Sequence, residues 1–166
     1  LALARPDKIV VYPAVGFEAT APSIAETILE AASLGVENFC VIPSIRLLPP
    51  TLDTLMCDPE LSVQGLLCSD HINSITDTEA YAFLARKHRL ACSIVGFELQ
   101  DILTGIRNLV EQIKVGSTDV DTSHSTSFSS EESARAVRMV AEVFFAVDTD
   151  WRGLGTVEES GFVIRD

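Results

Sequence analysis

Two stretches of the chain repeat the tetrapeptide Val-Gly-Phe-Glu, at Val15–Glu18 and at Val95–Glu98. Each stretch closes an apolar run and precedes a segment with helical periodicity. The carboxyl ends of the strands in a parallel sheet form its ligand-binding edge, and a glycine there lets another backbone or a ligand approach closely. We therefore expect Glu18 and Glu98 to stand at the mouth of one shared crevice.

These two carboxylates have two interpretations that the sequence leaves open. If they face a cleft, they could bind a cation, hold a substrate amine, or transfer a proton where burial raises the pKa of one of them. Alternatively, each caps the helix that follows it, since a carboxylate at a helix N-terminus meets free N–H groups and the positive end of the helix dipole. Thr20 and Asp101 come soon after the two glutamates and are further candidates for the cleft.

A second group combines Cys68, Asp70 and His71. Thiolate, carboxylate and imidazole can ligate a metal, but zinc sites use about four such ligands and no second cluster accompanies this one. Cys68 and His71 are therefore weak candidates for metal ligands, and His71 could instead donate a hydrogen bond across its loop. Ser44 and Arg46, at the end of the second predicted strand, could bind an anion.

The cysteines of the chain are Cys40, Cys57, Cys68 and Cys92, and they form no Cys-x-x-Cys pair. Three of them, all except Cys57, lie in or at the end of apolar, strand-like runs. A free thiol in such a run usually behaves as a small buried hydrophobe. We expect reduced, structural thiols rather than a disulfide framework.

Length and composition limit the class of protein. The chain has 166 residues, of which 47% are hydrophobic, and this is enough for one well-buried domain. A net charge of −12 disfavours binding to nucleic acid or to acidic membranes. No apolar stretch approaches the roughly 20 residues needed to cross a bilayer, and residues 1–6 lack the pattern of a signal peptide. We expect a cytoplasmic protein.

Strand-like and helix-like segments alternate through residues 1–116. Apolar, β-branched runs predict strands at 8–15, 38–42, 62–68 and 90–95. Helical spacing and capping residues predict helices at 24–34, after Pro49 and Pro50, at 78–88 and at 101–114. Crossovers of this length favour parallel pairing with right-handed connections. The predicted fold class is α/β, with a doubly wound, mostly parallel sheet flanked by helices in three Rossmann-like layers.

Residues 117–166 are expected to complete the same domain around the α/β core of residues 1–116. The stretch 117–130 is rich in Ser, Thr and Asp, and it predicts a loop or an excursion at the sheet edge. A helix over 134–144 and a turn followed by a strand over 151–166 come next. Within the core, the helix over 101–114 should bury one apolar stripe, made of Ile102, Ile106, Leu109, Val110 and Ile113.

An ordered set of segments also resembles a known family. The segments are Ala14–Pro22, Leu48–Pro50, Gly65–His71, Val95–Glu98 with Asp101–Leu103, Glu142–Phe144 and Trp151–Gly155. In this order and spacing they resemble the central portion of the HypD family of hydrogenase maturation proteins, over nearly the whole chain. Departures from the family pattern lie in loops, for example at Ala19, Ser44-Ile45 and Ser69–Asn73. Glu18, His71, Glu98 and Asp101 are the site-like positions that persist.

This resemblance implies a scaffold that helps to assemble the iron centre of nickel–iron hydrogenases, in which iron carries cyanide and carbon monoxide. It implies a HypC-like chaperone and a cyanide-supplying HypE-like protein as partners. Full-length members carry a four-iron, four-sulfur cluster and redox-active thiols. The family's Gly-Pro-Gly-Cys-Pro-Val-Cys segment and its cluster-binding cysteines would lie before Leu1 and after Asp166. We therefore expect no cluster bound to this chain and no stand-alone catalysis.

Two alternatives remain at the level of sequence. The first is a doubly wound domain that binds a small polar metabolite at the same strand ends. The second is a divergent interaction module that binds a partner protein without iron chemistry.

Overall fold

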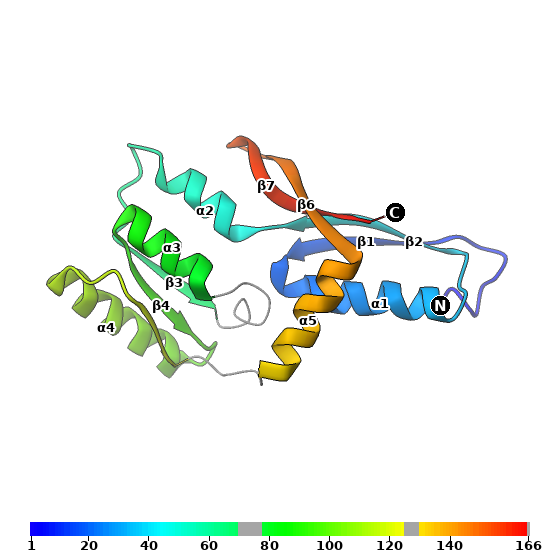
Figure 1. Cartoon of the computed structure of the whole chain (residues 1–166), viewed down its shortest axis with the longest axis horizontal. Helices are drawn as coiled ribbons and strands as arrows, with labels where there is room; N and C mark the ends of the chain where they lie inside the picture. The colour runs from blue at the N-terminus through cyan, green and yellow to red at the C-terminus, as the bar shows by residue number, and fades with distance from the viewer. Residues whose placement is uncertain (70–77, 125–129, 166) are drawn as a thin grey trace. The chain divides into compact units, whose positions relative to one another are not determined.

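The computed structural model describes residues 1–69, 78–124 and 130–165. It divides into two compact units, which we call unit 1 (residues 1–48 and 134–166) and unit 2 (residues 49–133) (Figure 1). This division differs from the boundary at residue 116 suggested by the sequence. Whether both units belong to one domain stays a prediction. The strands in the described ranges form one four-stranded and one three-stranded sheet, where the sequence analysis expected a single sheet.

The first half of unit 1 is a strand–helix–strand unit. Strand β1 (Val10–Phe17) leads through the 3-10 helix η1 (Glu18–Thr20) into helix α1 (Ala21–Ser33) and then to β2 (Phe39–Arg46). The two strands pair in parallel along their whole length. Helix α1 ends where Gly35 adopts a left-handed φ of 63°, a conformation that costs glycine little. The predicted parallel pairing and the predicted helix stop are both confirmed.

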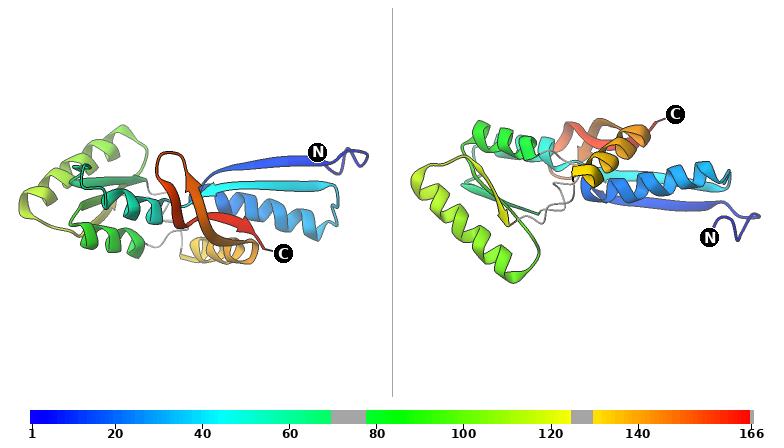
Figure 2. Two further views of the ribbon diagram at one scale, coloured as in Figure 1. Left: turned by 90° about the horizontal axis from the view of Figure 1, so that it is seen from above. Right: turned by 60° about the horizontal axis from the view of Figure 1, so that its bottom comes forward.

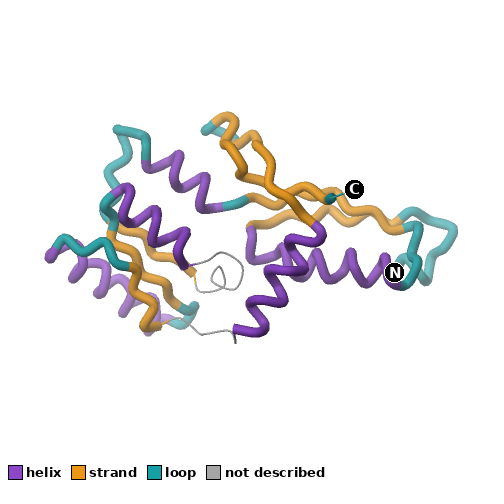
Figure 3. Tube along the Cα trace, in the orientation of Figure 1, coloured by secondary structure: helices purple, strands orange, loops and turns teal. Residues whose placement is uncertain are grey.

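A helix and a hairpin complete unit 1. Helix α5 (Ser130–Val143), of which residues 134–143 belong to unit 1, leads into β6 (Phe144–Trp151), which pairs antiparallel with β7 (Gly155–Ile164). Strand β7 also pairs antiparallel with the end of β2, so the sheet order is β1-β2-β7-β6 (Figure 3). Strand β6 is not among the strands predicted from the sequence, because its only signal is a short alternating run directly after a helix. Within the hairpin, the rings of Phe144 and Phe162 stack at 5.6 Å between centroids.

Unit 2 is a three-layer α/β arrangement. Its elements are α2 (Leu48–Met56), β3 (Gly65–Ser69), α3 (Thr78–His88), β4 (Ala91–Val95), α4 (Leu99–Val115) and β5 (Val120–His124). The first residue of α2, Leu48, belongs to unit 1. All three strands are parallel in the order β3-β4-β5. The central strand β4 is buried at every residue, as expected for a parallel strand covered on both faces. These observations confirm the predicted α/β class.

The two helices on this sheet cover opposite faces (Figure 2). Tyr81 and Leu84 of α3 pack with Cys68, Cys92 and Ile94 in one buried cluster. Helix α4 covers the other face. Strand β5 lies at the sheet edge, so the edge alternative for residues 117–130 is confirmed for residues 120–124.

Helix α4 is rotated relative to the stripe that the sequence predicted. Its buried residue is Gly105, where a Cβ atom would meet Val95 Cγ1 at 2.5 Å and Leu67 Cδ1 at 2.8 Å. Glycine at this position therefore sets how closely the helix approaches the sheet. The predicted burial is wrong for Ile106, Val110 and Ile113, which are exposed. These three side chains are exposed because other residues of α4 face the sheet.

Polar side chains of α4 take the sheet-facing positions next to Gly105. Asn108 Nδ2 donates a hydrogen bond to Asp121 Oδ2 at 2.7 Å, and buried Ser93 donates to the same oxygen at 3.0 Å. Gln112 accepts from the Cys92 N–H at 3.0 Å and donates to the Cys92 carbonyl at 3.1 Å. Buried polar groups of β4 and β5 need such partners, and this requirement outweighs the burial of three more apolar side chains.

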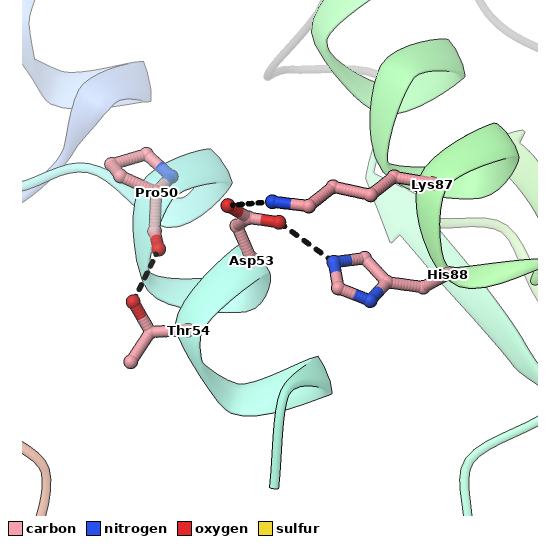
Figure 4. A network of polar contacts seen from close by, with 5 residues as sticks. All are labelled: Pro50, Asp53, Thr54, Lys87 and His88. Carbon is pink, nitrogen blue, oxygen red and sulfur yellow. Dashed lines mark hydrogen bonds and ion pairs between the residues drawn. The ribbon is translucent and has the colours of Figure 1, made fainter.

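Asp53 links α2 to α3 (Figure 4). Its Oδ2 accepts from Lys87 Nζ and its Oδ1 lies against His88 Nε2, both at 2.7 Å. Desolvation raises the pKa of Asp53, but the hydrogen bonds and charges of Lys87 and His88 outweigh it and lower that pKa overall. Asp53 lies inside α2 and holds two helices together.

The helices of the described ranges are each too short or too polar to cross a membrane.

Candidate functional site at the ends of the parallel strands

Both copies of the repeated tetrapeptide lie where the sequence analysis predicted them. Val15–Phe17 ends strand β1, and Glu18 begins η1. Val95 ends strand β4, and Glu98 is the residue before α4. Each glutamate therefore follows the carboxyl end of a parallel strand. Glu18 belongs to unit 1 and Glu98 to unit 2, and the crevice shared between them stays a prediction.

Glu18 is a buried carboxyl group that accepts a hydrogen bond from the Leu48 backbone. Its side chain is 1% exposed, and its Oε1 accepts the Leu48 N–H at 2.9 Å. Its Oε2 is buried and has no hydrogen-bond partner in the part of the chain that the structure describes. The two residues after Leu48 are Pro49 and Pro50, which have no N–H to donate. Neither proline can therefore supply a backbone donor to Oε2.

Burial raises the pKa of Glu18 above its ordinary value, although hydrogen bonds from its own N–H and from the Leu48 N–H oppose the shift. Glu18 therefore holds a proton more readily than an exposed glutamate does. The chemistry available at this position is proton storage or hydrogen-bond donation.

Aromatic and cationic side chains lie at the same end of the unit 1 sheet. The rings of Phe17 and Trp151 are 6.3 Å apart, and the Arg46 guanidinium lies 6.0 Å above the Trp151 ring. Trp151 Nε1 donates to Ser160 Oγ at 2.8 Å. Arg46 makes no ion pair within the described ranges. The anion-binding role suggested for Arg46 stays a prediction, and the Trp151 ring gives its guanidinium a fixed platform.

Neither glutamate makes a side-chain cap hydrogen bond to the helix that follows it. Glu98 stands at the N-cap position of α4 with an extended backbone, φ −70° and ψ 145°, and its side chain is exposed. Glu98, Asp101 and Arg107 line an open groove along the first turns of α4. Thr20 is exposed, and its hydroxyl donates to the Phe17 carbonyl at 2.8 Å. Thr20 thus stabilises the turn after β1.

The possible metal ligands are only partly visible. Asp70 and His71 lie outside the described residues. Cys68 is buried in the core of unit 2, where hydrogen bonding with the Cys92 thiol and burial raise the pKa of the Cys68 thiol. A protonated thiol is a poor metal ligand, because metals bind the thiolate. The metal-binding role of Cys68 and His71 stays a prediction.

Comparison with known proteins identifies the family. The family model named HypD and described as "Hydrogenase formation hypA family" matches residues 1–166. The chain belongs to the HypD family.

Several HypD relatives are similar over nearly the whole chain. "Hydrogenase maturation factor HypD" of Escherichia coli K12 is 32% identical over 162 residues, which is 97% of this chain and 43% of the relative. The proteins of the same name from Cupriavidus necator and Azotobacter vinelandii are 31% and 30% identical over 172 residues, covering 99% and 100% of this chain and 45% of each relative. The chain thus spans less than half the length of these HypD proteins.

Three of the segments that carried the resemblance to HypD meet in unit 1. The Glu18–Leu48 hydrogen bond joins the first Val-Gly-Phe-Glu segment to the Leu-Pro-Pro segment. The Phe17–Trp151 ring contact joins it to the Trp-Arg-Gly-Leu-Gly segment. Residues more than a hundred positions apart are thus neighbours at one end of one sheet.

The residues of this chain do not fit the four-iron, four-sulfur cluster implied for full-length HypD proteins. Such a cluster needs four thiolates close together. Cys40 and Cys57 are exposed, whereas Cys68 and Cys92 are buried between a sheet and a helix. Within residues 1–69, 78–124 and 130–165, no group of three or more His, Cys, Asp and Glu could hold a metal ion. The predicted burial of Cys40 is wrong, because its side chain points away from the core of unit 1.

The cluster of Asp53, Lys87 and His88 in this HypD chain was not predicted from the sequence. Asp53 lies 34 residues before Lys87, and no spacing rule connects two positions on separate helices. The available signal was indirect: Lys87 and His88 end a predicted helix, where basic side chains are favoured.

Proposed function

We propose that this chain is the central scaffold domain of a HypD-type maturation protein, which helps to assemble the iron centre of nickel–iron hydrogenase with its cyanide and carbon monoxide ligands. The iron centre is the cargo of this process. The chain positions the cargo and its carriers, and it performs no turnover alone.

One observation carries this proposal. The segments that resemble HypD proteins include loops and turns as well as strands, and three of them converge on Glu18, Leu48 and Trp151. Core packing alone does not require a buried carboxyl group with an unsatisfied oxygen, because such a group costs about 1–3 kcal/mol. The presence of this group at a strand end favours a functional role.

The two glutamates have different roles in this proposal. Glu18, held by Leu48 and shielded from water, supplies a proton or a hydrogen bond to a group that enters at the end of β1. Glu98, exposed beside Asp101, contacts the carrier protein through its charge. The proposed site also includes His71 and Cys68.

The partners in this proposal are proteins of the maturation machinery. A HypC-like chaperone carries the iron, and a HypE-like protein supplies cyanide. Both partners are inferred from the family, since the relatives are themselves named hydrogenase maturation factors.

The test uses the full gene product in a host that lacks its own HypD protein. We expect Glu98→Ala and Glu18→Gln each to lower the amount of active hydrogenase by about tenfold or more, the equivalent of roughly 1.4 kcal/mol. Both changes keep the fold, because Glu98 is exposed and glutamine keeps an acceptor for the Leu48 N–H. The measurement is hydrogenase activity in extracts at matched protein level.

Glu30→Ala is the matched control, because Glu30 is an exposed glutamate near the C-terminal end of α1, whereas Glu18 precedes the N-terminal end of that helix. It should leave maturation unchanged. Wild-type maturation by both Glu18→Gln and Glu98→Ala would refute the proposed site.

A further inference from the structure

Arg46 is a partly buried guanidinium at the last residue of strand β2. It lies 6.0 Å from the centre of the Trp151 ring, and its side chain makes no ion pair or hydrogen bond with the residues that the structure describes. A guanidinium has five N–H donors, and arginine is seldom removed from water without partners for them. The described part of the chain therefore leaves the donors of Arg46 unused.

A carboxyl group close to Arg46 in the sheet register does not pair with it. Arg46 is the register partner of Phe17 on β1, and Glu18 is the next residue. The Oε1 of Glu18 accepts the Leu48 N–H instead, and burial raises the pKa of this carboxyl group. Glu18 therefore does not compensate the positive charge of Arg46.

Ser44 adds a second unused donor on the same side of β2. Side chains two residues apart on a strand point to one face, so Ser44 and Arg46 share a face and Ile45 points to the other. Ile45 is fully buried, whereas the Ser44 hydroxyl is partly exposed and makes no hydrogen bond among the described residues. One face of the strand end thus presents a hydroxyl and a guanidinium, about 6.6 Å apart along the strand.

Two aromatic rings border the guanidinium of Arg46. Phe17 is 45% exposed, and its ring lies 6.3 Å from the Trp151 ring. Trp151 is itself fixed, because its Nε1 donates to the Oγ of buried Ser160 at 2.8 Å. A fixed ring beside the guanidinium restricts the arginine side chain, so binding through its N–H groups costs less conformational entropy.

The donors of Ser44 and Arg46 select a ligand that brings acceptors and negative charge. Arginine binds the oxygens of carboxylate and phosphate groups through two parallel N–H bonds. Both side chains lie on one strand, which fits a single acid group better than an extended charged surface. They also lie at the carboxyl end of a parallel strand pair, where α/β sheets bind their ligands.

We propose that Ser44 and Arg46 bind a small oxyanion, whose acid group is a carboxylate or a phosphate, at the carboxyl end of β2. Phe17 and Trp151 border this site. The proposal goes beyond the maturation role, and its test does not depend on that role.

The probes are acetate and inorganic phosphate, each titrated into the full chain at an ionic strength held constant with sodium chloride. Two-dimensional NMR of the nitrogen-labelled chain follows the Trp151 indole N–H and the backbone N–H groups of residues 44–48. Trp151 is the only tryptophan of the chain, so its indole signal is identified directly. We expect saturable shifts of these signals with a Kd on the order of millimolar for at least one probe, and the tighter probe identifies the acid group.

Variants locate the site. Arg46→Gln should weaken binding by about tenfold or more, because it removes the charged donors, and Ser44→Ala should weaken it by about threefold or more. Arg152→Gln is the matched control, because Arg152 is an exposed arginine directly after Trp151 and its loss changes the net charge equally. It should bind as wild type does. Circular dichroism establishes that each variant is folded.

Three results would overturn the proposal. The first is a set of shifts that do not saturate with either probe, or that sodium chloride alone reproduces, because general ionic effects then explain them. The second is binding by Arg46→Gln with the affinity of wild type. The third is equal weakening by Arg46→Gln and Arg152→Gln, because the net charge of the chain and not this site then attracts the anion. Unchanged binding by Ser44→Ala would refute the two-residue site.

Discussion

At the scale of single residues, the two identical tetrapeptides end in glutamates with opposite environments. Glu18 is buried and bonded to Leu48, whereas Glu98 is exposed at the start of α4. The difference arises in unit 1, where the chain leaves strand β2. The Leu48 N–H donates to one carboxyl oxygen of Glu18, and the other oxygen has no donor among the described residues. The same tetrapeptide therefore ends in a buried carboxyl group with a raised pKa in unit 1 and in an exposed glutamate in unit 2.

This difference predicts a pH effect for Glu18→Gln. Burial raises the pKa of Glu18 above the ordinary value of 4.5, so the folded state holds this proton more tightly than the unfolded state does. The stabilisation is fully present below about pH 4.5 and is lost as pH rises through the folded pKa. The free energy of unfolding of wild type should thus fall relative to Glu18→Gln across that window. Urea unfolding at a series of pH values measures the difference.

The variant Glu18→Ala tests how much the hydrogen bond between Leu48 and Glu18 contributes to the free energy of unfolding, apart from the charge of Glu18. Below about pH 4.5 it should cost about 1–3 kcal/mol, because it also removes the acceptor of the Leu48 N–H, and this cost should shrink as pH rises and wild type loses stability. If wild type and Glu18→Gln show parallel pH curves, the raised pKa of Glu18 is wrong.

At the scale of elements, helix α4 shows how polar contacts override an apolar pattern. Its apolar periodicity predicts one buried stripe, yet the helix buries Gly105 and bonds Asn108 and Gln112 to β4 and β5. The hydrogen-bonding needs of the sheet determine which side of the helix faces it. The apolar side of α4 that does not face the sheet is exposed.

Gly105→Ala tests this close approach of α4 to the sheet. Helix propensity alone predicts a gain of about 1 kcal/mol in the free energy of unfolding. The added Cβ would meet Val95 at 2.5 Å and Leu67 at 2.8 Å, and overpacking of this kind costs about 1–3 kcal/mol. We expect a net loss, measured by urea unfolding. Gln100→Ala, at an exposed position of the same helix, should change stability by less than about 0.5 kcal/mol. A gain for Gly105→Ala would contradict the described packing.

At the scale of the whole molecule, the chain contains two units, each with its own sheet and core. The core of unit 2 gathers Tyr81, Leu84 and Ile94 between α3 and the sheet. Unit 1 contains Trp151, the only tryptophan of the chain. Trp151 fluorescence therefore reports on unit 1, whereas circular dichroism reports on both units.

This arrangement predicts separable unfolding. Leu84→Ala removes a fully buried side chain from unit 2 and should destabilise that unit by about 2–5 kcal/mol. The urea midpoint from circular dichroism should fall clearly, while the midpoint from Trp151 fluorescence should move less. Ile45→Ala, in the core of unit 1, should show the reverse pattern. Coincident midpoints in both variants would mean that the two units unfold together.

The sequence by itself determined the local features of this protein. The strand and helix alternation, the helix over Thr78–His88, the stop at Gly35 and the position of both glutamates after parallel strands all result from periodicity and turn chemistry. The family is also encoded in the sequence, because its segments lie in a fixed order along the chain.

Tertiary structure alone decided what depends on distant neighbours. The division into two sheets, the strand β6, the exposed side of α4, the burial of Glu18 and the link from Asp53 to Lys87 and His88 each arise from residues far apart in the chain. Periodicity shows that a helix has an apolar side, but only the partners across the sheet determine which side is buried, because unsatisfied polar groups cost more than exposed apolar ones.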